Sequence, residues 1–355
     1  MAGPGPRRSA VGVGDAGVTT VAVVEGDDAA PEAVRPVVAL LDGMGLGIEW
    51  TYPEPGPEGL GVIDAADCTL FGATSGRSAA ALFHLRWGRQ TYANVRPLRW
   101  LEGARSPLAS PGGIDLVIVR ENLEDVYVRA EGDLEELARP APVSLTWRRP
   151  VNELGPGRFA LKVITDVGCE RVIRYAYRLA QSRGGRLCLS AKHNMLPRTD
   201  GLFIEVGRSL ARSYPAVEVE VLLIDDLAHQ LVLDASRFDV IVVPNLYGDI
   251  LSDLAAGLVG GLGMAPTACY GDHYAYFEPA HGTAPDLAGT GTINPTATLL
   301  SGTMMLEHLG FADPARRVVE AVEQVYRAGR VLTPDQGGTA TTESFCAAVA
   351  DHLDR

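Results

Sequence analysis

The sequence lacks the features that would place it in a membrane or outside the cell. No apolar run approaches the roughly 18 residues that a membrane-spanning helix needs. Residues 1–17 carry two arginines but no apolar segment, which argues against a secretory signal, and their glycine, alanine and proline content predicts a mobile tail. The five cysteines are scattered and form no C-x-x-C pair. They are typical of reduced thiols and not of a disulfide framework or a zinc site, so we expect a cytoplasmic protein without a membrane partner.

Positive charge is also scarce. The chain has 31 lysines and arginines against 44 aspartates and glutamates, which gives a net charge of −13. This balance argues against nucleic acid and anionic membranes as partners, although a local arginine cluster can still bind a small anion. The 355 residues, 46% of them hydrophobic and 21% charged, are typical of a soluble globular protein with two domains or one large one.

A dinucleotide fingerprint is missing from the places where it would function. Residues 12–17 match G-x-G-x-x-G, but they precede the first predicted strand, residues 18–24. The fingerprint has to follow a strand and open a helix, so we expect no Rossmann-type cofactor site.

Apolar runs and helical patterns alternate along the chain. Strands are predicted at residues 18–24, 48–52, 68–71, 114–119, 186–190, 217–224 and 240–243. Helices are predicted at 31–41, 79–87, 166–181, 295–309, 313–329 and 341–354. This alternation predicts an α/β fold with a largely parallel sheet.

Two aspartates follow the most strand-like run of the chain. The β-branched residues 240–243 predict a buried strand, which Pro244 and Asn245 end. Asp249 and Asp253 then stand four residues apart, so a helix would place both carboxylates on one face, where they repel each other. A Mg²⁺ or Mn²⁺ ion would neutralise them. Acidic residues also suit the dipole of a helix N-terminus, and spacing alone favours that second interpretation.

Basic residues follow several predicted strands. Arg120 ends the strand at 114–119, at the sheet edge where α/β proteins bind ligands. With Arg86 and Arg96 it could clamp a di- or tricarboxylate, although each arginine could equally be an ordinary surface residue. Lys192 follows the strand at 186–190 and could act as a base if it is desolvated; otherwise it is a solvated lysine.

The segment 72–78, Gly-Ala-Thr-Ser-Gly-Arg-Ser, opens the predicted helix at 79–87. The side chains of Thr74, Ser75, Arg77 and Ser78 could bind an anion at the helix N-terminus. Capping of the helix by a serine explains the same residues equally well.

Four long motifs together resemble one known family. They are Tyr-Ala-Asn-Val-Arg-Pro at 92–97, Arg-Glu-Asn-Leu-Glu-Asp-Val-Tyr at 120–127, Asn-Leu-Tyr-Gly-Asp-Ile-Leu-Ser-Asp at 245–253 and Glu-Pro-Ala-His-Gly-Thr-Ala-Pro-Asp at 278–286. In this order they resemble the β-decarboxylating dehydrogenases, which act on isocitrate, homoisocitrate, 3-isopropylmalate, tartrate or D-malate. The resemblance extends from about residue 18 to the end of the chain.

The resemblance implies two α/β domains around a central, largely parallel sheet. Residues 18–97 and 254–355 would form the large, cofactor-binding domain. Residues 98–253 would form the small domain, and the hairpin predicted at 139–160 would be the clasp of an obligate homodimer.

The resemblance also implies a role for each candidate residue. Arg86, Arg96 and Arg120 would bind the substrate carboxylates. Tyr127 would protonate the enol that decarboxylation leaves, and Lys192 would help to remove the hydroxyl proton.

A metal site and a cofactor site complete the implied machinery. Asp249 and Asp253 would bind Mg²⁺ or Mn²⁺, with Asp225 as the third ligand. Asp225 and Lys192 would serve the active site of the partner subunit. Asn194 would lie beside the substrate. The cofactor would contact Glu278, His281, Gly282, Thr283, Ala284, Asp286, Leu287 and Asn294.

Asp286 favours NAD over NADP. A carboxylate can accept a hydrogen bond from a free ribose 2′-hydroxyl but repels a 2′-phosphate. NADP-dependent members of the family carry lysine and tyrosine at the positions of Asp286 and Leu287.

The sequence departs from the family pattern in two places. The first loop, 26–32, has lost two glycines. The segment before Arg86 is short, and Leu82 and Phe83 stand where isocitrate and homoisocitrate enzymes carry an asparagine and an arginine.

The expected reaction is metal-dependent oxidative decarboxylation of a (2R)-2-hydroxy-3-carboxy acid to a 2-oxo acid and CO₂, with reduction of NAD. We favour an isocitrate- or homoisocitrate-like substrate whose distal anion, a carboxylate or a phosphonate, binds at residues 74–78. The alternatives are a 3-alkylmalate that contacts Leu82 and Phe83, tartrate or D-malate, and a non-catalytic regulatory subunit. The last is disfavoured because the arginines, the tyrosine, the lysine and the aspartates are all present.

Overall fold

The β-branched run 240–243 forms strand β10 (Val240–Val243) in the interior of a ten-stranded sheet. In this computed structural model, residues 18–138 and 140–353 are described, so the tail predicted at 1–17 lies outside the described residues. Alternate side chains of β10 enter two different cores, as the period of two in a strand requires. Val240 and Val242 pack in one hydrophobic cluster, and Ile241 and Val243 pack in another on the opposite face.

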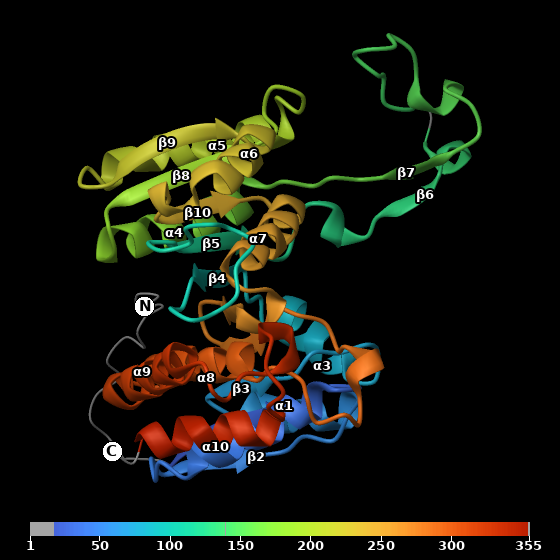
Figure 1. Ribbon diagram of the computed structural model, residues 1–355. Helices are drawn as coiled ribbons and strands as arrows, with labels where there is room; N and C mark the ends of the chain where they lie inside the picture. The colour runs from blue at the N-terminus through green and yellow to red at the C-terminus, as the bar shows by residue number, and fades with distance from the viewer. Residues whose placement is uncertain (1–17, 139, 354–355) are drawn as a thin grey trace.

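The sheet contains two parallel groups that antiparallel strands join. Its order is β2-β1-β3-β12-β11-β4-β5-β10-β8-β9. Figure 1 shows β4, β5, β10, β8 and β9 following one another in this order. Besides β10, the strands are β1 (Thr19–Val24), β2 (Ile48–Thr51), β3 (Cys68–Phe71), β4 (Ala93–Arg99), β5 (Asp115–Glu121), β8 (Arg186–Ala191), β9 (Glu218–Leu223), β11 (Pro266–Tyr270) and β12 (Ala275–Pro279). The three pairs β12–β11, β11–β4 and β4–β5 are antiparallel, and the other pairs are parallel. The prediction of a largely parallel α/β sheet is therefore confirmed, while β4, β11 and β12 were not predicted.

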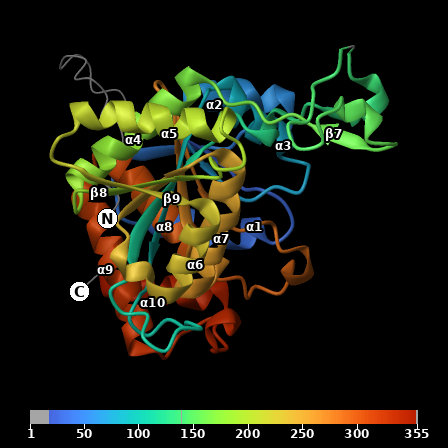
Figure 2. The same cartoon turned by 90° about the horizontal axis from the view of Figure 1, so that it is seen from above.

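Helices cover both faces of the sheet (Figures 1 and 2). They are α1 (Ala30–Asp42), α2 (Leu60–Ala65), α3 (Ala79–Phe83), α4 (Asp166–Ser182), α5 (Thr199–Leu210), α6 (Ile224–Asp234), α7 (Asn245–Val259), α8 (Thr296–His308), α9 (Ala312–Ala328) and α10 (Thr342–Leu353). Side chains of α4 and α5 share a hydrophobic cluster with Val240, whereas those of α6 and α7 share one with Ile241. The sheet therefore places α7 and the end of β10 against β4 and β5, where the predicted arginines lie.

A two-stranded arm projects from the rest of the chain, as Figures 1 and 2 both show. Strands β6 (Glu131–Asp133) and β7 (Arg158–Ala160) pair antiparallel, and Val143 bridges to Pro150 nearer the tip. The hairpin predicted at 139–160 is therefore present, but its pairing begins earlier, at residue 131. Its role as a dimer clasp stays a prediction.

The predicted domain boundaries fall inside regular elements. The boundary after residue 97 lies within β4, and the boundary after residue 253 lies within α7. The division into two domains stays a prediction, and β4 and α7 are the elements shared between its halves. None of the described helices has the length and apolarity needed to cross a membrane.

Candidate active site

Asn245 opens α7 and organises the arginines around it. Its side chain is buried, and its Oδ1 accepts hydrogen bonds from Arg120 Nε at 2.9 Å and from Arg86 Nη2 at 3.2 Å. Its Nδ2 donates to the carbonyl of Glu124 at 3.1 Å. Strand β5, the turn after it and α7 are thereby joined. Asn245 belongs to a family motif, but nothing in the sequence alone indicates this role for its side chain.

Asp249 lies one turn further along α7 and is contacted by three of the predicted residues. Arg120 donates to its Oδ1, and the hydroxyl of Tyr127 donates to its Oδ2 at 2.5 Å. Arg96 Nη2 lies 3.7 Å from the same carboxylate. Burial opposes ionisation of Asp249, but Arg120 and Tyr127 outweigh it, so the pKa of Asp249 is lowered. The residues predicted for substrate binding, proton transfer and metal binding therefore meet at one carboxylate.

Arg96 joins the second aspartate of α7 to this group. Its Nη1 donates to Ser252 Oγ at 2.6 Å and to Asp253 Oδ1 at 3.1 Å. Arg96 is 6% exposed, and burial, together with the nearby Arg120, lowers its pKa. Burial raises the pKa of Asp253, although Arg96 acts in the opposite direction. A divalent cation beside Asp253 would favour its charged form, so this half of the predicted metal site fits a hard cation with oxygen ligands.

Two guanidinium groups lie close to the ring of Tyr127. It is held in a single 3-10 turn, Val126–Val128, that begins after Asp125. The guanidinium carbons of Arg86 and Arg120 lie 4.9 and 4.8 Å from the ring centroid. Burial raises the pKa of the Tyr127 hydroxyl, although the charge of Arg120 lowers it. The hydroxyl therefore keeps its proton, as an acid catalyst must before it acts.

Lys192 and Asp225 form a separate pair. Lys192 Nζ lies 2.5 Å from Asp225 Oδ1, which lowers the pKa of Asp225 through the hydrogen bond from Lys192. No hydrogen bond or ion pair between described residues joins this pair to Asp249 or Tyr127. Nor do any three histidine, cysteine, aspartate or glutamate side chains gather at metal-binding distance within residues 18–138 and 140–353. Asp225 therefore does not join Asp249 and Asp253 within one chain.

A buried network that the sequence analysis missed lies behind Lys192. Asp200 of α5 is fully buried and accepts from the Lys192 backbone N–H at 2.8 Å and from the Tyr247 hydroxyl at 2.9 Å. Lys162 Nζ pairs with it at 2.6 Å. This network fixes the backbone beside Lys192 relative to α7. Asn194, predicted to lie beside the substrate, is exposed on the loop that follows.

The predicted anion site at 74–78 already holds a carboxylate of the same chain. Asp27 Oδ2 accepts from Thr74 Oγ1 at 2.7 Å and from the Ser75 backbone N–H at 2.9 Å. Ser78 Oγ donates to Asp27 Oδ1 at 3.0 Å. Burial opposes ionisation of Asp27, but these hydrogen bonds outweigh it and lower its pKa. In the chain alone these donors bind a carboxylate of the first loop, and their binding of a distal substrate anion stays a prediction. Arg77 takes no part and is exposed.

Leu82 and Phe83 lie in different surroundings. Leu82 is half-buried and packs against the cluster of α2, β1 and β3 side chains. Phe83 is 46% exposed and stacks on Trp87, with ring centroids 5.1 Å apart and an interplanar angle of 25°. After Phe83 the chain forms a π-helical turn, His84–Gly88, which carries Arg86. Such turns are rare and often occur at functional sites.

Five of the predicted cofactor residues line one cavity of about 620 Å³. They are His281, Gly282, Ala284, Leu287 and Asn294. The Nδ1 of His281 lies 2.8 Å from the carbonyl of Gly282, while its Nε2 is buried and has no hydrogen-bond partner among the described residues. Burial lowers the pKa of His281, so the ring is neutral at physiological pH. The volume and the unpaired nitrogen fit a bound cofactor with polar groups.

The other predicted cofactor residues have different surroundings. Asp286 is exposed in a 3-10 turn, Pro285–Leu287. Thr283 is buried, and its carbonyl accepts from the Ala29 N–H at 3.1 Å. Glu278 lies within β12, where burial raises its pKa.

The amide of Asn294 is committed to the framework of the protein. Its Nδ2 donates to Asp335 at 2.9 Å, and its Oδ1 accepts from the Thr296 N–H at 3.0 Å. Asn294 lies on the wall of the cavity, but both ends of its amide already have partners in the protein. Its predicted contact with the cofactor stays a prediction.

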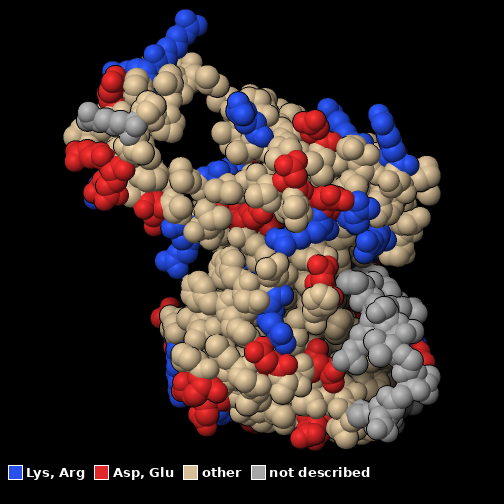
Figure 3. All heavy atoms as spheres, turned by 180° about the vertical axis from the view of Figure 1, so that it is seen from behind, with Lys and Arg blue, Asp and Glu red and all other residues tan. Residues whose placement is uncertain are grey.

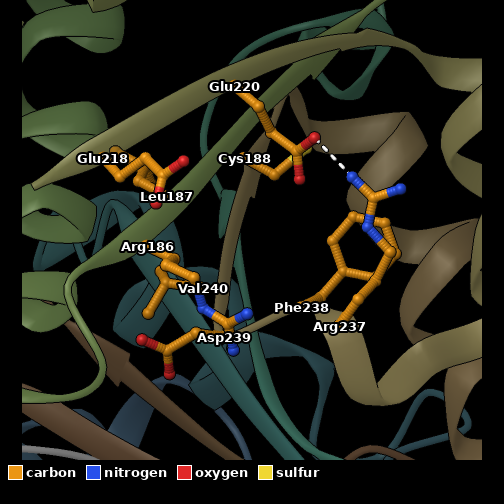
Figure 4. A pocket seen from close by; sticks show the side chains of 9 residues that line it. All are labelled: Arg186, Leu187, Cys188, Glu218, Glu220, Arg237, Phe238, Asp239 and Val240. Atoms are coloured by element: carbon orange, nitrogen blue, oxygen red, sulfur yellow. Dashed lines mark hydrogen bonds and ion pairs between the residues drawn. The ribbon is translucent and has the colours of Figure 1, made fainter.

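A smaller cavity of about 240 Å³ lies where β8, β9 and β10 begin (Figure 4). It is therefore at the ends of these strands opposite to the predicted site. It is lined by Arg186, Leu187, Cys188, Glu218, Glu220, Arg237, Phe238, Asp239 and Val240. These residues begin β8, β9 and β10, whereas Lys192 and Asn245 follow the ends of β8 and β10. Arg237 pairs with Glu220 at 2.6 Å across this cavity. The cavity contains none of the predicted site residues.

Charge is mixed on the face opposite that of Figure 1. Figure 3 shows acidic and basic side chains interspersed there, without a continuous basic area of the kind that binds nucleic acid. This distribution agrees with the net charge of −13.

Comparisons with known proteins agree with the motifs and the geometry. A family model described as isocitrate/isopropylmalate dehydrogenase matches residues 20–353. An isocitrate/homoisocitrate dehydrogenase of Thermus thermophilus is 41% identical over 352 residues, covering 94% of this chain and 98% of that protein. A 3-isopropylmalate dehydrogenase of Archaeoglobus fulgidus is 39% identical over 351 residues, covering 94% and 99%. The crystal structure of isocitrate dehydrogenase from Methylococcus capsulatus matches with a TM-score of 0.83 at 33% identity, covering 95% of this chain and all of that one. This chain therefore belongs to the isocitrate/isopropylmalate dehydrogenase family of β-decarboxylating dehydrogenases.

Proposed function

We propose that this protein catalyses the NAD- and metal-dependent oxidative decarboxylation of a 2-hydroxy acid that carries a carboxylate on C3. The observation that carries the proposal is the convergence of Arg96, Arg120 and Tyr127 on Asp249. A binding protein for a carboxylate would need the arginines but would have no use for a half-buried tyrosine hydroxyl beside a carboxylate. The same argument disfavours a non-catalytic subunit.

The arginines hold and orient the substrate carboxylates. Arg96 and Arg120 are almost fully buried, so their guanidinium groups have already lost most of their water and lose little more on binding an anion. Arg86 is fixed by the Asn122 carbonyl at 2.6 Å and by Asn245. Three guanidinium groups anchored by the protein keep the bond between C3 and its carboxylate in one orientation while it breaks.

Two residues move protons. Lys192 helps to take the proton from the substrate hydroxyl as hydride leaves the adjacent carbon. After CO₂ departs, the Tyr127 hydroxyl gives its proton to the carbon that carried the carboxylate. Burial of this hydroxyl favours its protonated form.

The metal and the cofactor would bind at the two sites already described. Asp249 and Asp253, with Asp225 of the other protomer, would hold Mg²⁺ or Mn²⁺, which supplies a positive charge that polarises the substrate oxygens when bound. NAD would occupy the cavity beside His281, where Asp286 would accept a hydrogen bond from the free ribose 2′-hydroxyl.

The proposal includes a homodimer with shared active sites. We call Arg96, Arg120, Tyr127 and Asp249, which contact one another, the Asp249 group. Within one chain, Lys192 and Asp225 pair with each other and not with this group. Large apolar side chains are exposed on the elements around them: Leu233 of α6 is 70% exposed and Ile250 of α7 is 58% exposed. At the tip of the arm, Leu145 is 84% exposed. A second copy that covered these side chains would bring its Lys192 and Asp225 toward Asp249.

The direct test is an assay of nicotinamide reduction and CO₂ release. The panel is D-malate, tartrate, isocitrate, homoisocitrate and 3-isopropylmalate, each with NAD or NADP and with Mg²⁺ or Mn²⁺. We expect one CO₂ for each NADH formed from at least one compound, and loss of both products when a chelator removes the metal. The Asp249→Asn variant is the matched control and should be inactive although folded. An intact dimer that turns over no member of the panel contradicts the proposal, and a preference for NADP contradicts the role given to Asp286.

A further inference from the structure

We propose that Lys162 positions both proton-transfer groups of its chain, Tyr127 and Lys192, through two buried aspartates. This inference rests on the proposed function, in which Lys192 serves the active site of the other protomer. One Lys162 then supports proton transfer in both active sites of the dimer. Because Lys162 acts through the aspartates, it is a positioning residue and not a catalytic one.

Asp125 holds the turn that carries Tyr127. Its side chain is fully buried, and its Oδ1 accepts from the Val126 N–H at 2.8 Å. Its Oδ2 accepts from the Leu246 N–H at 3.2 Å, in the first turn of α7. The backbone of Asp125 has a φ of 68°, which is unfavourable for a residue with a side chain unless surrounding contacts hold it. Contacts of this carboxylate therefore keep the chain on the path that places the Tyr127 hydroxyl beside Asp249.

Asp200 holds the backbone of Lys192 itself. Its side chain is fully buried, and its Oδ2 accepts from the Lys192 N–H at 2.8 Å. Lys192 directly follows β8, so this hydrogen bond fixes the point from which its side chain extends. A shift of Asp200 therefore shifts the ammonium that helps to take the hydroxyl proton.

The Lys162 ammonium lies between these two aspartates. Its Nζ is 2.6 Å from Asp200 Oδ1 and 3.6 Å from Asp125 Oδ2, and only 15% of its side chain is exposed. It also lies 4.3 Å from the centroid of the Tyr247 ring in α7. Without this charge, two buried carboxylates would repel each other and would have to take up protons or move apart. Either change weakens the hydrogen bonds by which they hold the two backbone segments.

The kind of cation at this position is unusual for the chain. Of its 31 lysines and arginines, 29 are arginines, and the two lysines are Lys162 and Lys192. An ammonium is a compact charge with three donors, whereas a guanidinium is a larger planar fork. The space between two carboxylates and an aromatic ring suits the smaller group, and here the chain carries a lysine although arginine serves at almost every other basic position.

The two groups that Lys162 positions act in different active sites. Tyr127 contacts α7 of its own chain, whereas Lys192 is assigned to the site of the other protomer. Loss of one Lys162 should therefore slow enol protonation in one site and removal of the hydroxyl proton in the other. Substrate binding should change little, because Arg96 and Arg120 are held by carboxylates of α7.

The first measurement is steady-state kinetics of Lys162→Met in the metal-loaded dimer, with a compound of the panel that the wild type turns over. We expect kcat to fall about a hundredfold, which is the loss caused by misplacing a catalytic group by about 1 Å, and KM to stay within about threefold.

The matched control is Arg183→Met. Arg183 also bridges two aspartates, Asp115 and Asp239, and its side chain is 10% exposed, but it lies where β5 and β10 begin. Both variants should lower the Tm, whereas Arg183→Met should keep kcat within about twofold of the wild type.

Hybrid dimers with one wild-type chain separate the two groups. In the first hybrid the variant chain carries Lys162→Met and Asp249→Asn. Its remaining site uses the variant chain's Lys192, so the first turnover of NADH should be about a hundredfold slower. In the second hybrid the variant chain carries Lys162→Met and Lys192→Met. Its remaining site uses the variant chain's Tyr127, so the first turnover of NADH should stay fast and the following turnovers should be about a hundredfold slower. Hybrids with Asp249→Asn or Lys192→Met alone are the references and should keep about half of the wild-type kcat.

The inference is wrong if kcat of Lys162→Met is unchanged, if it falls no more than that of Arg183→Met, or if only one of the two hybrids is slowed. Should Lys162→Met not fold, Lys162→Arg replaces it, because it keeps the charge. Both hybrids should then be about tenfold slower, since a planar fork cannot take the position of the ammonium.

Two other results would overturn the proposed function instead. One is a wild-type dimer that turns over no compound of the panel. The other is a hybrid of Lys192→Met with Asp249→Asn that stays inactive, which would show that the active sites are not shared.

Discussion

The two parts of the candidate active site differ in how far one chain completes them. The Asp249 group draws side chains from β4, β5, the Tyr127 turn and α7, and it buries its arginines almost fully. The Lys192–Asp225 pair lies on the loop after β8 and the first turn of α6, and the Asp225 side chain is 64% exposed. One part is assembled by the fold of the chain, and the other part is exposed to solvent.

This difference has an electrostatic reason. Burying several guanidinium groups requires neighbouring carboxylates and carbonyls, and a single folded chain can supply them only where its strands and helices already meet. A lone exposed ion pair contributes little to stability, so the folding of one chain does not depend on the direction in which these two side chains point. It can therefore be positioned for a partner subunit without cost to the fold.

The largest expected effect is on catalysis by hybrid dimers. Lys192→Met and Asp249→Asn should each lower kcat by about 10³-fold or more, because each removes a group needed for proton transfer or metal binding. If Lys192 acts across the dimer, a hybrid of the two variants contains one site with both groups intact. Its kcat per dimer should return to about half that of the wild type. The measurement is the turnover of a hybrid purified through two different affinity tags.

Two controls accompany the hybrid. Each variant reassembled with itself should stay inactive, and a hybrid of Lys192→Met with the wild type should keep one active site. An inactive Lys192→Met/Asp249→Asn hybrid would show that both groups act within one chain, and the comparison between the two parts of the site would then fail.

The next largest effect is expected from replacing Tyr127, which lies in the part of the site that one chain assembles. Tyr127→Phe should lower the rate at which the enol is protonated about 10²- to 10³-fold, because the enol then lacks its acid. The hydride step should be less affected, so a first turnover of NADH should remain visible in stopped-flow measurements. Tyr247→Phe is the matched control, since that hydroxyl also donates to an aspartate, the buried Asp200 instead of Asp249. Equal losses in the two variants would assign Tyr127 a structural role.

The sequence predicted the strands that consist of apolar runs and missed those that carry polar or proline residues. Strand β10 is a continuous run of valine and isoleucine, and its predicted bounds agree with the structure. Strand β4 buries Asn94 and Arg96 and contains Pro97, so neither alternation nor an apolar run marks it as a strand. Its polar side chains are there because α7 and β11 supply their partners, which only the fold brings together.

The site was predicted best where the motifs were long. Arg96, Arg120, Tyr127 and Asp249 each belong to one of the four motifs, and they contact one another in the structure. The partners that set their geometry lie far away in the sequence: Asp27 reaches residues 74–78, and Asp200 reaches Tyr247. In the sequence, Asp27 is one acidic residue of an altered loop and Asp200 follows a threonine at a helix start. Neither has a local signal, because what distinguishes them is burial.

The smallest expected effect is on the free energy of unfolding. Its dependence on pH should distinguish the surroundings of the Asp249 group from those of the Lys192–Asp225 pair. Glu121 ends β5 beneath the assembled part and is 3% exposed. Burial raises the pKa of Glu121 to about 7, against hydrogen bonds from the backbone N–H groups of Glu124 and Leu123; the charge of Glu124 adds to the rise and that of Arg171 opposes it. A carboxyl whose pKa is higher in the folded state binds its proton more tightly there. Its contribution to stability is complete below the pKa of the unfolded chain and is lost as the pH rises through 7. The free energy of unfolding should therefore fall by about 2 kcal/mol between pH 5 and pH 7 through this group.

Chemical denaturation of Glu121→Gln should show a flatter pH dependence, while Glu205→Gln, at an exposed position of α5, should keep the wild-type slope. An unchanged slope in Glu121→Gln would mean that burial does not hold this carboxyl protonated, and the assembled part would then be no more sensitive to pH than the exposed one.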